Sequence, residues 1–329
     1  MAEYKVLLTC PPMIGRIDEY REKLSEYNMD ITIPDFTQVL SVKELIDLVP
    51  QFDAWIIGDD PATEAVFKAG KEGRLKAAMK WGVGTDNVDF DACNKYNIPV
   101  SNTPGMFNNE VADVAVGYVI ALAREFMAID RKVRQGGWYK PCGMSLTDKK
   151  VALIGFGNIG RCIAHRLLAF GLKIHAVDPF FRKENGRITC DADIEFSESI
   201  HAVDISDLQT ATSNCDFIVV CCALTPSSHH SINKSVMMNA KPGVKIVNVG
   251  RGPIINQSDL VELMHSGYVS GAALDVFEVE PLPQDDELRQ FENTVFGAHN
   301  CSNTKEAVDR TSFLVIDKLK KYLDEDKSD

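Results

Sequence analysis

The chain has 329 residues, 45% of them hydrophobic, and its 47 acidic against 35 basic side chains leave a net charge of −12. This length and apolar content predict a globular protein of two domains, and the negative charge argues against a general attraction to nucleic acid or anionic membrane. The chain starts without a signal-peptide pattern and holds no apolar run of about 18 residues, so we expect a soluble cytoplasmic protein with no membrane or nucleic-acid partner.

The first hundred residues alternate apolar strands with helical patterns, which is typical of a small α/β domain. Strands are predicted within 4–10, 29–34, 53–59, 75–82 and 98–103, and helices at 41–49 and 64–70. The Pro, Gly and Asn residues of "NTPGMFNNE" (102–110) predict a break before a new helix.

A helix is predicted in the 108–126 region, where "NEVADVAVGYVIALAREF" carries apolar residues on nearly every side. Such a helix must be covered all round. It lies either deep inside its own subunit or against a second copy of the chain. We favour a homodimer formed through this region, because one sheet face supplies too little cover.

From Lys150 onward strands and helices alternate most regularly. Strands are predicted at 150–156, 173–179, 215–225, 244–250, 271–277 and 293–299, with helices at 158–171, 233–243 and 257–267. This alternation predicts a parallel sheet covered by helices on both faces. A final helix at 305–326 is expected to pack back on the first domain, which makes that domain discontinuous.

The nine cysteines are scattered, without a C-x-x-C pair or the Cys and His spacing of zinc sites. We therefore expect most of them to be buried, reduced thiols, and we expect no bound metal. Cys221 and Cys222 are adjacent in a strand pattern, where neighbours point to opposite faces and packing is the simpler role.

The glycines of "GFGNIG", Gly155, Gly157 and Gly160, stand between a predicted strand and a predicted helix. In this G-x-G-x-x-G pattern the first glycine permits a tight turn, the second lets the backbone approach a pyrophosphate, and the third allows close helix packing. Asp178 ends the next strand, 23 residues after Gly155, where a carboxylate accepts hydrogen bonds from the adenosine ribose. That carboxylate would repel the 2′-phosphate of NADP, so the pattern predicts NAD.

Four polar residues end or follow three successive predicted strands: Arg251, Asp275, Glu280 and His299. Ligands of open α/β sheets bind beyond the carboxyl ends of strands, so these side chains are expected near a nicotinamide. A guanidinium clamps a carboxylate with two hydrogen bonds, and an imidazole exchanges a proton with the oxygen at a reacting carbon. A carboxylate beside the imidazole orients it and favours its protonated form. The set predicts hydride transfer on a carbonyl acid.

The ordered motifs "GVGTDNVD", "NTPG", "VADVAVG", "GFGNIG", "KPGVKIVNVGRG" and "GAALDVFEVEP" resemble the D-isomer-specific 2-hydroxyacid dehydrogenase family along nearly the whole chain. The resemblance implies two doubly wound parallel-sheet α/β domains, with a NAD-binding Rossmann domain at 105–299 inserted in a flavodoxin-like substrate domain formed by 1–104 and 300–329. It also implies a homodimeric, NAD-dependent oxidoreductase, similar to phosphoglycerate dehydrogenase and hydroxypyruvate reductase, that acts on a small 2-hydroxy or 2-oxo acid.

The resemblance also implies roles for single residues. Arg251 would bind the substrate carboxylate, His299 would be the acid/base, and Glu280 would support His299. Backbone groups of Val83 and Gly84 would touch the same carboxylate. The residues implied to line the dinucleotide, with Asp275 near the nicotinamide, are Gly155, Gly157, Asn158, Ile159, Gly160, Asp178, Cys222, Val249, Gly250 and Asp275.

Two segments depart from the family pattern. Many members follow the histidine with a glycine-containing segment, whereas this chain has "HNCSNT", so its residues are expected to alter the pocket wall or the hinge. In "WIIGDDPAT", Asp59 and Asp60 stand where phosphoglycerate-specific relatives tend to carry an arginine, and two carboxylates would repel a phosphate. We therefore favour a non-phosphorylated substrate. Lys80 partly restores positive charge, so a phosphorylated substrate is not excluded.

Other functions fit parts of the pattern. Formate dehydrogenases resemble this chain with glutamine in place of Glu280, so formate is disfavoured. Phosphite dehydrogenase-like oxidation uses a similar Arg, Glu and His set and stays open. An NAD-sensing, corepressor-like relative would bind partner peptides as a dimer, but no basic segment accompanies the domains in this sequence.

Overall fold

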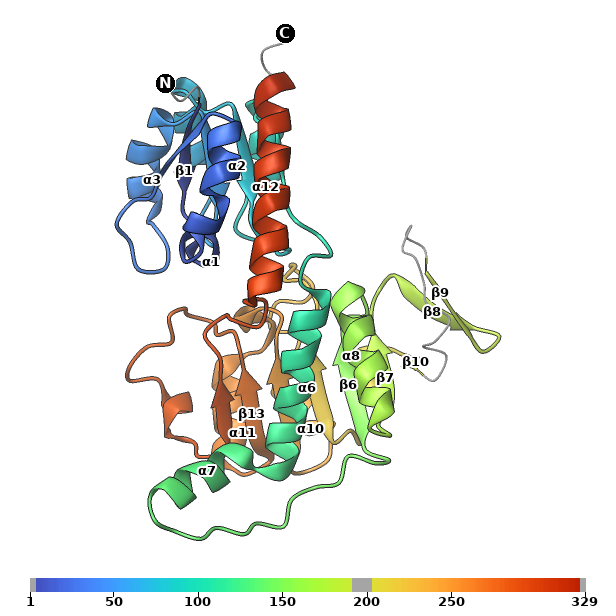
Figure 1. The fold of residues 1–329 in the computed structure, drawn as a ribbon. Coiled ribbons are helices and arrows are strands. Elements are labelled where there is room, and N and C mark those ends of the chain that lie inside the picture. Colours follow the sequence, from blue (N-terminus) through green and yellow to red (C-terminus); the bar gives the residue numbers. More distant parts are fainter. Residues whose placement is uncertain (1–3, 191–202, 326–329) are drawn as a thin grey trace. The chain divides into compact units, whose positions relative to one another are not determined.

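The protein is described here by a computed structural model that covers residues 4–190 and 203–325. The chain divides into two compact units (Figure 1): unit 1 comprises Met1–Phe107 and Ser302–Asp329, and unit 2 comprises Asn108–Cys301. Across the residues that the structure describes, no helix combines the length and apolar character needed to cross a membrane.

Unit 1 is built on a five-stranded sheet in the order β2-β1-β3-β4-β5, and each adjacent pair is parallel. Its strands are β1 (Tyr4–Leu8), β2 (Met29–Thr32), β3 (Ala54–Ile57), β4 (Ala77–Lys80) and β5 (Val100–Ser101). β3 and β4 are buried along their whole length, because both faces of a parallel sheet are covered. The strand order is that of flavodoxin-like folds.

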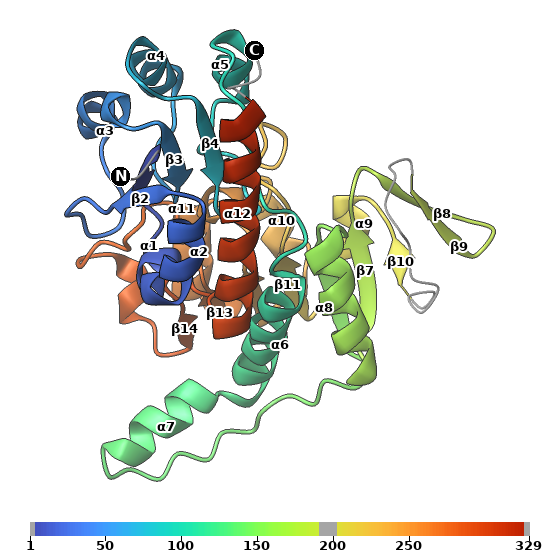
Figure 2. The same ribbon diagram turned by 45° about the horizontal axis from the view of Figure 1, so that its top comes forward.

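Helices cover both faces of this sheet (Figure 2). On one face, Leu45, Phe67 and Cys93 from three helices pack around Trp55 of β3. On the other, the last helix of the chain contacts β3 and β4 and is joined to Arg16 through Asp309 by two hydrogen bonds of 2.8 Å. The helices are α1 (Pro11–Ile14), η1 (Ile17–Tyr20), α2 (Arg21–Glu26), α3 (Val42–Leu48), η2 (Val49–Gln51), α4 (Glu64–Glu72), α5 (Phe90–Lys95) and α12 (Lys305–Glu325).

Unit 2 contains a seven-stranded parallel sheet in the order β10-β7-β6-β11-β12-β13-β14. This is the order of dinucleotide-binding folds, in which successive strands are added on one side of β6 and then, from β11 onward, on its other side. The α/β fold class predicted from the sequence is confirmed. The strands are β6 (Lys150–Ile154), β7 (Lys173–Val177), β10 (Asp204–Ile205), β11 (Phe217–Val220), β12 (Val244–Asn248), β13 (Val269–Leu274) and β14 (Thr294–Phe296).

Helices flank this second sheet as well. α6 packs on α8 and on β12, β13 and β14, while α10 and α11 contribute to a core with the strands. The helices are α6 (Asn108–Arg124), α7 (Phe126–Arg134), α8 (Asn158–Ala169), α9 (Leu208–Thr212), α10 (Lys234–Met238), η4 (Gly252–Ile254), α11 (Gln257–His265) and η5 (Glu287–Gln290).

A short antiparallel hairpin that the sequence analysis missed follows β7. It pairs β8 (Phe181–Glu184) with β9 (Arg187–Cys190). Its turn residues, Asn185 and Gly186, have positive φ of 50° and 76°. Asn-Gly is the preferred pair for such a tight turn, so the signal was present in the sequence.

α6 is the helix whose apolar pattern suggested burial on nearly every side. Its neighbours α8, β12, β13 and β14 all belong to its own unit. Packing within unit 2 therefore accounts for most of the apolar side chains of α6. Their burial does not by itself require a second copy of the chain. Its buried side chains are those of Val111, Ala112, Ala115, Val116, Val119, Ala121, Leu122 and Ala123.

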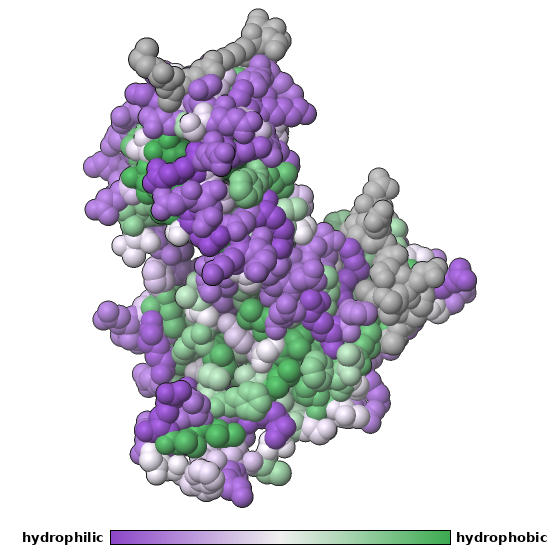
Figure 3. Space-filling model, in the orientation of Figure 1, coloured by the Kyte–Doolittle hydropathy of each residue, from purple (hydrophilic) through white to green (hydrophobic). Residues whose placement is uncertain are grey.

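Exposed apolar side chains gather instead on α7 and the segment after it. Phe126, Met127 and Val133 of α7 are exposed, and Trp138 in the following segment is 82% exposed. Figure 3 shows apolar residues at the surface of unit 2 where α7 lies. We call these four residues the α7 patch.

Candidate active site

The glycine-rich turn connects β6 to α8 as its spacing predicted. Gly155 has φ +103°, and a Cβ there would lie 2.7 Å from the backbone nitrogen of Cys222. A Cβ on Gly160 would lie 2.2 Å from the carbonyl oxygen of Gly155. Both positions exclude any larger side chain, because backbone atoms cannot yield. The turn therefore sits directly against the end of β11.

Gly157 differs from the other two glycines. A Cβ built on it would meet nothing within 4 Å, so packing inside the protein does not demand glycine there. Gly157 is also the N-cap of α8 and provides no side chain to cap the first N–H groups. Open space beside a helix N-terminus suits the close approach of a pyrophosphate, so this turn fits the dinucleotide.

Asp178 lies just beyond the end of β7 and is bound to the same turn. Its Oδ2 accepts the backbone N–H of Phe156 at 2.8 Å, and its Oδ1 accepts that of Phe180 at 3.0 Å. Each carboxylate oxygen has a second lone pair, and the residue is only partly buried. The carboxylate is thus oriented by the protein and still suited to accept a ribose hydroxyl.

The loops after β11 and β12 lie against each other. A Cβ on Gly250 would fall 2.9 Å from the carbonyl oxygen of Cys222, and Val249 is buried. Burial raises the pKa of the Cys222 thiol to about 11, and burial also raises the pKa of the Cys221 thiol well above its ordinary value. Both thiols therefore stay protonated near neutral pH, as expected of packing residues.

Asn248, the last residue of β12, is a positioning residue that the sequence analysis missed. Its buried side chain accepts the N–H of Gly250 at 3.0 Å and donates to the carbonyl oxygen of Arg251 at 2.9 Å. An asparagine that ends an apolar strand is the signal that the sequence contained. Its amide holds the backbone on both sides of the predicted substrate arginine.

Arg251 occupies a loop that is pressed against the segment after β13. A Cβ on Gly252 would lie 1.8 Å from the carbonyl oxygen of Phe277, so only glycine allows the two backbones to meet. The Arg251 side chain is partly buried, and its Nη1 donates to the carbonyl oxygen of Gly250 at 3.0 Å. The arginine is therefore held close to the loop that carries Glu280.

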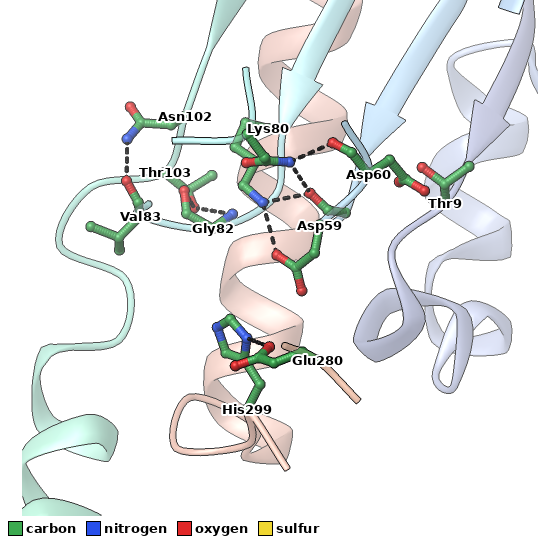
Figure 4. A network of polar contacts seen from close by, with 12 residues as sticks. Thr9, Asp59, Asp60, Lys80, Gly82, Val83, Asn102, Thr103, Glu280 and His299 are labelled. Atoms are coloured by element: carbon green, nitrogen blue, oxygen red, sulfur yellow. Dashed lines mark hydrogen bonds and ion pairs between the residues drawn. The ribbon is translucent and has the colours of Figure 1, made fainter. Parts of the chain in front are cut away.

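Glu280 and His299 form a direct pair, drawn in Figure 4. Nδ1 of His299 lies 2.8 Å from Oε2 of Glu280, and Oε1 accepts the backbone N–H of Phe277 at 2.9 Å. The two side chains are 27% and 28% exposed, so both reach solvent. With Nδ1 turned to the carboxylate, Nε2 is the imidazole nitrogen suited to exchange a proton with a ligand.

Asp275, predicted near the nicotinamide, is only 3% exposed. Its carboxylate accepts the backbone N–H groups of Asn300 at 3.2 Å and Cys301 at 3.0 Å. The structure therefore places this carboxylate against the loop that carries His299. Within the described part of the chain, no group of three or more His, Cys, Asp or Glu side chains is arranged to hold a metal ion.

In unit 1, Val83 and Gly84 lie in a loop that follows β4, and neighbouring residues hold its backbone (Figure 4). The hydroxyl of Thr103 accepts the N–H of Gly82 at 3.1 Å and donates to its carbonyl oxygen at 3.0 Å. The amide of Asn102 donates to the carbonyl oxygen of Val83 at 2.8 Å. The backbone N–H groups of Val83 and Gly84 are the ones predicted to contact the substrate carboxylate.

Asp59 and Asp60 do not form the pair of phosphate-repelling carboxylates that the sequence suggested. Asp60 is fully buried, its Oδ1 accepts the N–H of Leu40 at 2.9 Å, and burial raises the pKa of its carboxyl. Asp59 is 41% exposed and accepts a hydrogen bond from the buried Lys80 ammonium at 3.1 Å (Figure 4). The prediction of two phosphate-repelling charges was wrong, because one side chain is buried in unit 1 and the other is paired.

The comparisons with known proteins show the family of the chain. The family model for the NAD binding domain of D-isomer specific 2-hydroxyacid dehydrogenases matches residues 116–301. The chain is 34% identical to a hydroxypyruvate reductase of Thermotoga maritima, over 98% of this chain and 99% of that protein. It is 31% identical to a glyoxylate/hydroxypyruvate reductase of Arabidopsis thaliana, over 96% and 93% of the two chains.

Solved structures agree with the fold. The crystal structure of a D-lactate dehydrogenase from Aquifex aeolicus, complexed with NAD and lactic acid, matches with a TM-score of 0.81 and 21% identity. The match covers 98% of this chain and 96% of that one. At this identity the likeness concerns the fold alone.

Proposed function

Because the chain belongs to the D-isomer specific 2-hydroxyacid dehydrogenase family and is an NAD-dependent oxidoreductase, we propose that Arg251, Glu280 and His299 catalyse its reaction. The reaction is hydride transfer between nicotinamide and C2 of a D-2-hydroxy or 2-oxo acid. The observation that carries the proposal is the 2.8 Å contact between His299 Nδ1 and Glu280 Oε2, on loops that follow neighbouring strands. Such a pair is suited to donate and accept a proton repeatedly.

In the direction of reduction, Arg251 holds the substrate carboxylate through two hydrogen bonds. Protonated His299 gives its Nε2 proton to the oxygen on C2, while Glu280 accepts from Nδ1 and stabilises the charged imidazole. Bound NADH supplies the hydride. Oxidation of the hydroxy acid runs these steps in reverse, with neutral His299 as the base. Val83 and Gly84 would donate backbone N–H groups to the same carboxylate.

The cofactor contacts are part of the same proposal. The turn around Gly157 and the first N–H groups of α8 would hold the pyrophosphate, and Asp178 would accept the adenosine ribose hydroxyls. Unit 2 would thus be the NAD-binding domain and unit 1 the substrate domain. The remaining residues proposed to line the dinucleotide are Gly155, Asn158, Ile159, Gly160, Cys222, Val249, Gly250 and Asp275.

The substrate proposal is a small, non-phosphorylated 2-oxo acid. Two relatives identical at 34% and 31% are named as hydroxypyruvate and glyoxylate/hydroxypyruvate reductases, so these acids come first. The Lys80 and Asp59 pair carries no net charge, so it neither attracts nor repels a phosphate strongly. The choice therefore rests on the relatives and no longer on charge repulsion.

The test is to follow NADH absorbance while the purified protein is offered glyoxylate, hydroxypyruvate, phosphohydroxypyruvate, pyruvate and 2-oxoglutarate. We expect turnover with glyoxylate or hydroxypyruvate. Turnover with phosphohydroxypyruvate alone would overturn the substrate proposal and keep the enzyme class. Silence across the panel with NADH bound would favour phosphite oxidation, tested with NAD and phosphite, or a corepressor-like role.

The homodimer and the cytoplasmic location stay predictions. We propose that the α7 patch, which continues the predicted 108–126 region, is covered by a second copy, because exposed large apolar side chains such as that of Trp138 favour association. Light scattering after size exclusion should give about twice the 36.4 kDa chain mass. Trp138→Glu with Phe126→Glu should give the monomer mass, and an unchanged mass would place the interface elsewhere.

A further inference from the structure

The loop that carries His299 is tied to a buried carboxylate, that of Asp275. The backbone carbonyl of Asp275 accepts the N–H of His299 at 2.7 Å. Its carboxylate accepts the next two backbone N–H groups, those of Asn300 at 3.2 Å and Cys301 at 3.0 Å. Three consecutive residues of the loop therefore depend on one aspartate for their hydrogen bonds.

The same loop has a backbone conformation that needs such support. His299 has φ +53°, in the left-handed region that residues other than glycine adopt at an energetic penalty. Two residues earlier, a Cβ on Gly297 would lie 1.9 Å from Oδ1 of Asp275 and 2.6 Å from the hydroxyl oxygen of Tyr118. The carboxylate and the hydroxyl are thus packed directly on the loop backbone.

Two protonated side chains face the Asp275 carboxylate. The hydroxyl of Tyr118, on α6, lies 3.5 Å from Oδ1, at the long end of the hydrogen-bond range. Cys301 is 5% exposed, and its backbone N–H donates to Oδ2 of the same carboxylate at 3.0 Å, so its thiol is buried beside Asp275. Burial and then the charge of Asp275 raise the pKa of both the Tyr118 hydroxyl and the Cys301 thiol. Both groups therefore keep their protons near neutral pH and are available as donors.

We propose that Tyr118 and Cys301 are positioning residues, which orient the Asp275 carboxylate so that it holds residues 297–301 and sets the direction of the His299 imidazole. The inference rests on the proposed function of His299. The proposal also bears on the "HNCSNT" segment. Where many relatives have a glycine-containing segment, this chain has Cys301, which carries a thiol. A buried carboxylate with too few donors would be expensive to keep charged, so each donor matters.

The first test compares steady-state kinetics of Tyr118→Phe, Cys301→Ala and Cys301→Ser. Loss of one donor should lower kcat about 3- to 10-fold, with NADH affinity near the wild-type value. The pH profile of kcat/KM should shift in Tyr118→Phe and Cys301→Ala, because a displaced imidazole no longer meets Glu280 in the same geometry. Cys301→Ser, which keeps a donor of similar size, should recover most of kcat.

The matched controls remove the same groups elsewhere in unit 2. Tyr268→Phe deletes a hydroxyl that donates to the carbonyl oxygens of Met238 and Ala240, and Cys215→Ala deletes a fully buried thiol. Both should keep the wild-type pH profile even if they lower thermal stability. A general loss of folding would show in the controls as well, and a positioning effect would not.

The second test needs no turnover. Hydrogen exchange followed by mass spectrometry reports the peptide that contains residues 297–301, whose backbone N–H groups the Asp275 network protects. We expect faster exchange in this peptide for Tyr118→Phe and Cys301→Ala, and wild-type exchange for Cys301→Ser and the controls. Peptides from β6 and β11 should stay unchanged in all variants.

The outcomes separate this inference from the proposed function. Faster exchange with lower kcat supports both. Faster exchange in a protein that turns over no 2-oxo acid would support the positioning network and remove only the dehydrogenase role. Unchanged exchange in both Tyr118→Phe and Cys301→Ala would overturn the inference, whatever the activity. If Tyr118→Phe does not fold, the Cys301 pair decides the question alone.

Discussion

The two units share an architecture and differ in what stands at their strand ends. Both have a parallel sheet flanked by helices, with a flavodoxin-like order in unit 1 and a dinucleotide-binding order in unit 2. In unit 1 Asp60, which follows β3, and Lys80, the last residue of β4, are buried and bound within the unit. In unit 2 the corresponding residues Glu280 and His299 keep about a quarter of their surface exposed.

The difference shows two separate requirements for a site. The sheet topology brings the strand ends to one edge, and glycines let the loops at that edge approach one another closely. Loops of unit 2 approach one another at Gly155, Gly250 and Gly252, where a Cβ would lie 1.8 to 2.9 Å from backbone of another loop. That close approach gathers side chains from several strands at one edge. Where the charged group at a strand end is buried, as the Lys80 ammonium is, it holds the backbone of a neighbouring loop and is not available to a ligand.

Among the substitutions that test this difference between the units, His299→Ala is expected to have the largest effect. We expect turnover to fall by about 10²- to 10⁴-fold, because no other side chain is proposed to exchange the substrate proton. NADH affinity, measured by fluorescence titration, should stay near the wild-type value. His175→Ala, which removes another partly buried imidazole of unit 2, is the control. Turnover of His299→Ala within about threefold of the wild type would remove His299 from the mechanism.

Arg251→Ala should raise KM for the oxo acid and lower kcat, by about 100-fold together in kcat/KM, because a carboxylate loses a charged partner with two donors. Arg251→Lys should recover part of KM only, since a lysine cannot make the forked contact. NADH affinity is the measurement that decides. An equal loss of NADH binding would make Arg251 a structural residue of the loop.

Gly157→Ala and Gly160→Ala separate the cofactor's needs from the protein's own packing. The first adds a Cβ into open space, and the second adds one 2.2 Å from the Gly155 carbonyl oxygen. Gly157→Ala should keep its melting temperature and weaken NADH binding about tenfold or more. Gly160→Ala should lose stability even without cofactor. Thermal melts with and without NADH measure both effects. If the turn did not hold the pyrophosphate, NADH would raise the melting temperature of Gly157→Ala as much as that of the wild type.

Asp178→Ala should reduce the preference for NADH over NADPH by about tenfold, because the charge that repels a 2′-phosphate is gone. Asp178→Asn is the sharper variant, since it keeps an acceptor oxygen and removes only the charge. The ratio of kcat/KM for the two cofactors is the readout. An unchanged ratio in both variants would place the ribose contact on another residue.

The smallest effect is expected in unit 1, from Asp60→Asn. Burial raises the folded-state pKa of Asp60 above the ordinary 3.8, so the folded chain binds this proton more tightly than the unfolded chain. Its contribution to stability is therefore present at low pH and is lost as pH rises toward the folded-state pKa. The asparagine, which still accepts from Leu40, should flatten that dependence.

Urea unfolding between about pH 4 and pH 8 measures this effect, with fluorescence of the buried Trp55 and Trp81 reporting on unit 1. Asp47→Asn, at an exposed position on α3, should follow the wild-type curve. The same pH dependence in Asp60→Asn as in the wild type would show that Asp60 does not titrate in the folded state.

Sequence patterns predicted the long, regular elements well and the local exceptions poorly. Apolar runs such as 150–156 and 244–250 became strands because a parallel sheet buries both faces of each strand. The Asn185 and Gly186 turn was overlooked, although its residues carry the signal. Asp60 was misjudged because two adjacent carboxylates look alike in a sequence, and only packing decides which one is buried.

The sequence by itself determined the α/β class, the order of strands and helices, the glycine spacing of the dinucleotide turn and the residue types available for acid/base chemistry. These follow from periodicity and from the conformations that glycine alone tolerates. Only the tertiary structure decided that His299 meets Glu280 at 2.8 Å, that Lys80 pairs with Asp59, and that Tyr118 and the backbone of Cys301 contact Asp275. Contacts between residues far apart in the chain depend on how sheets and loops pack, and spacing along a sequence does not encode side-chain direction.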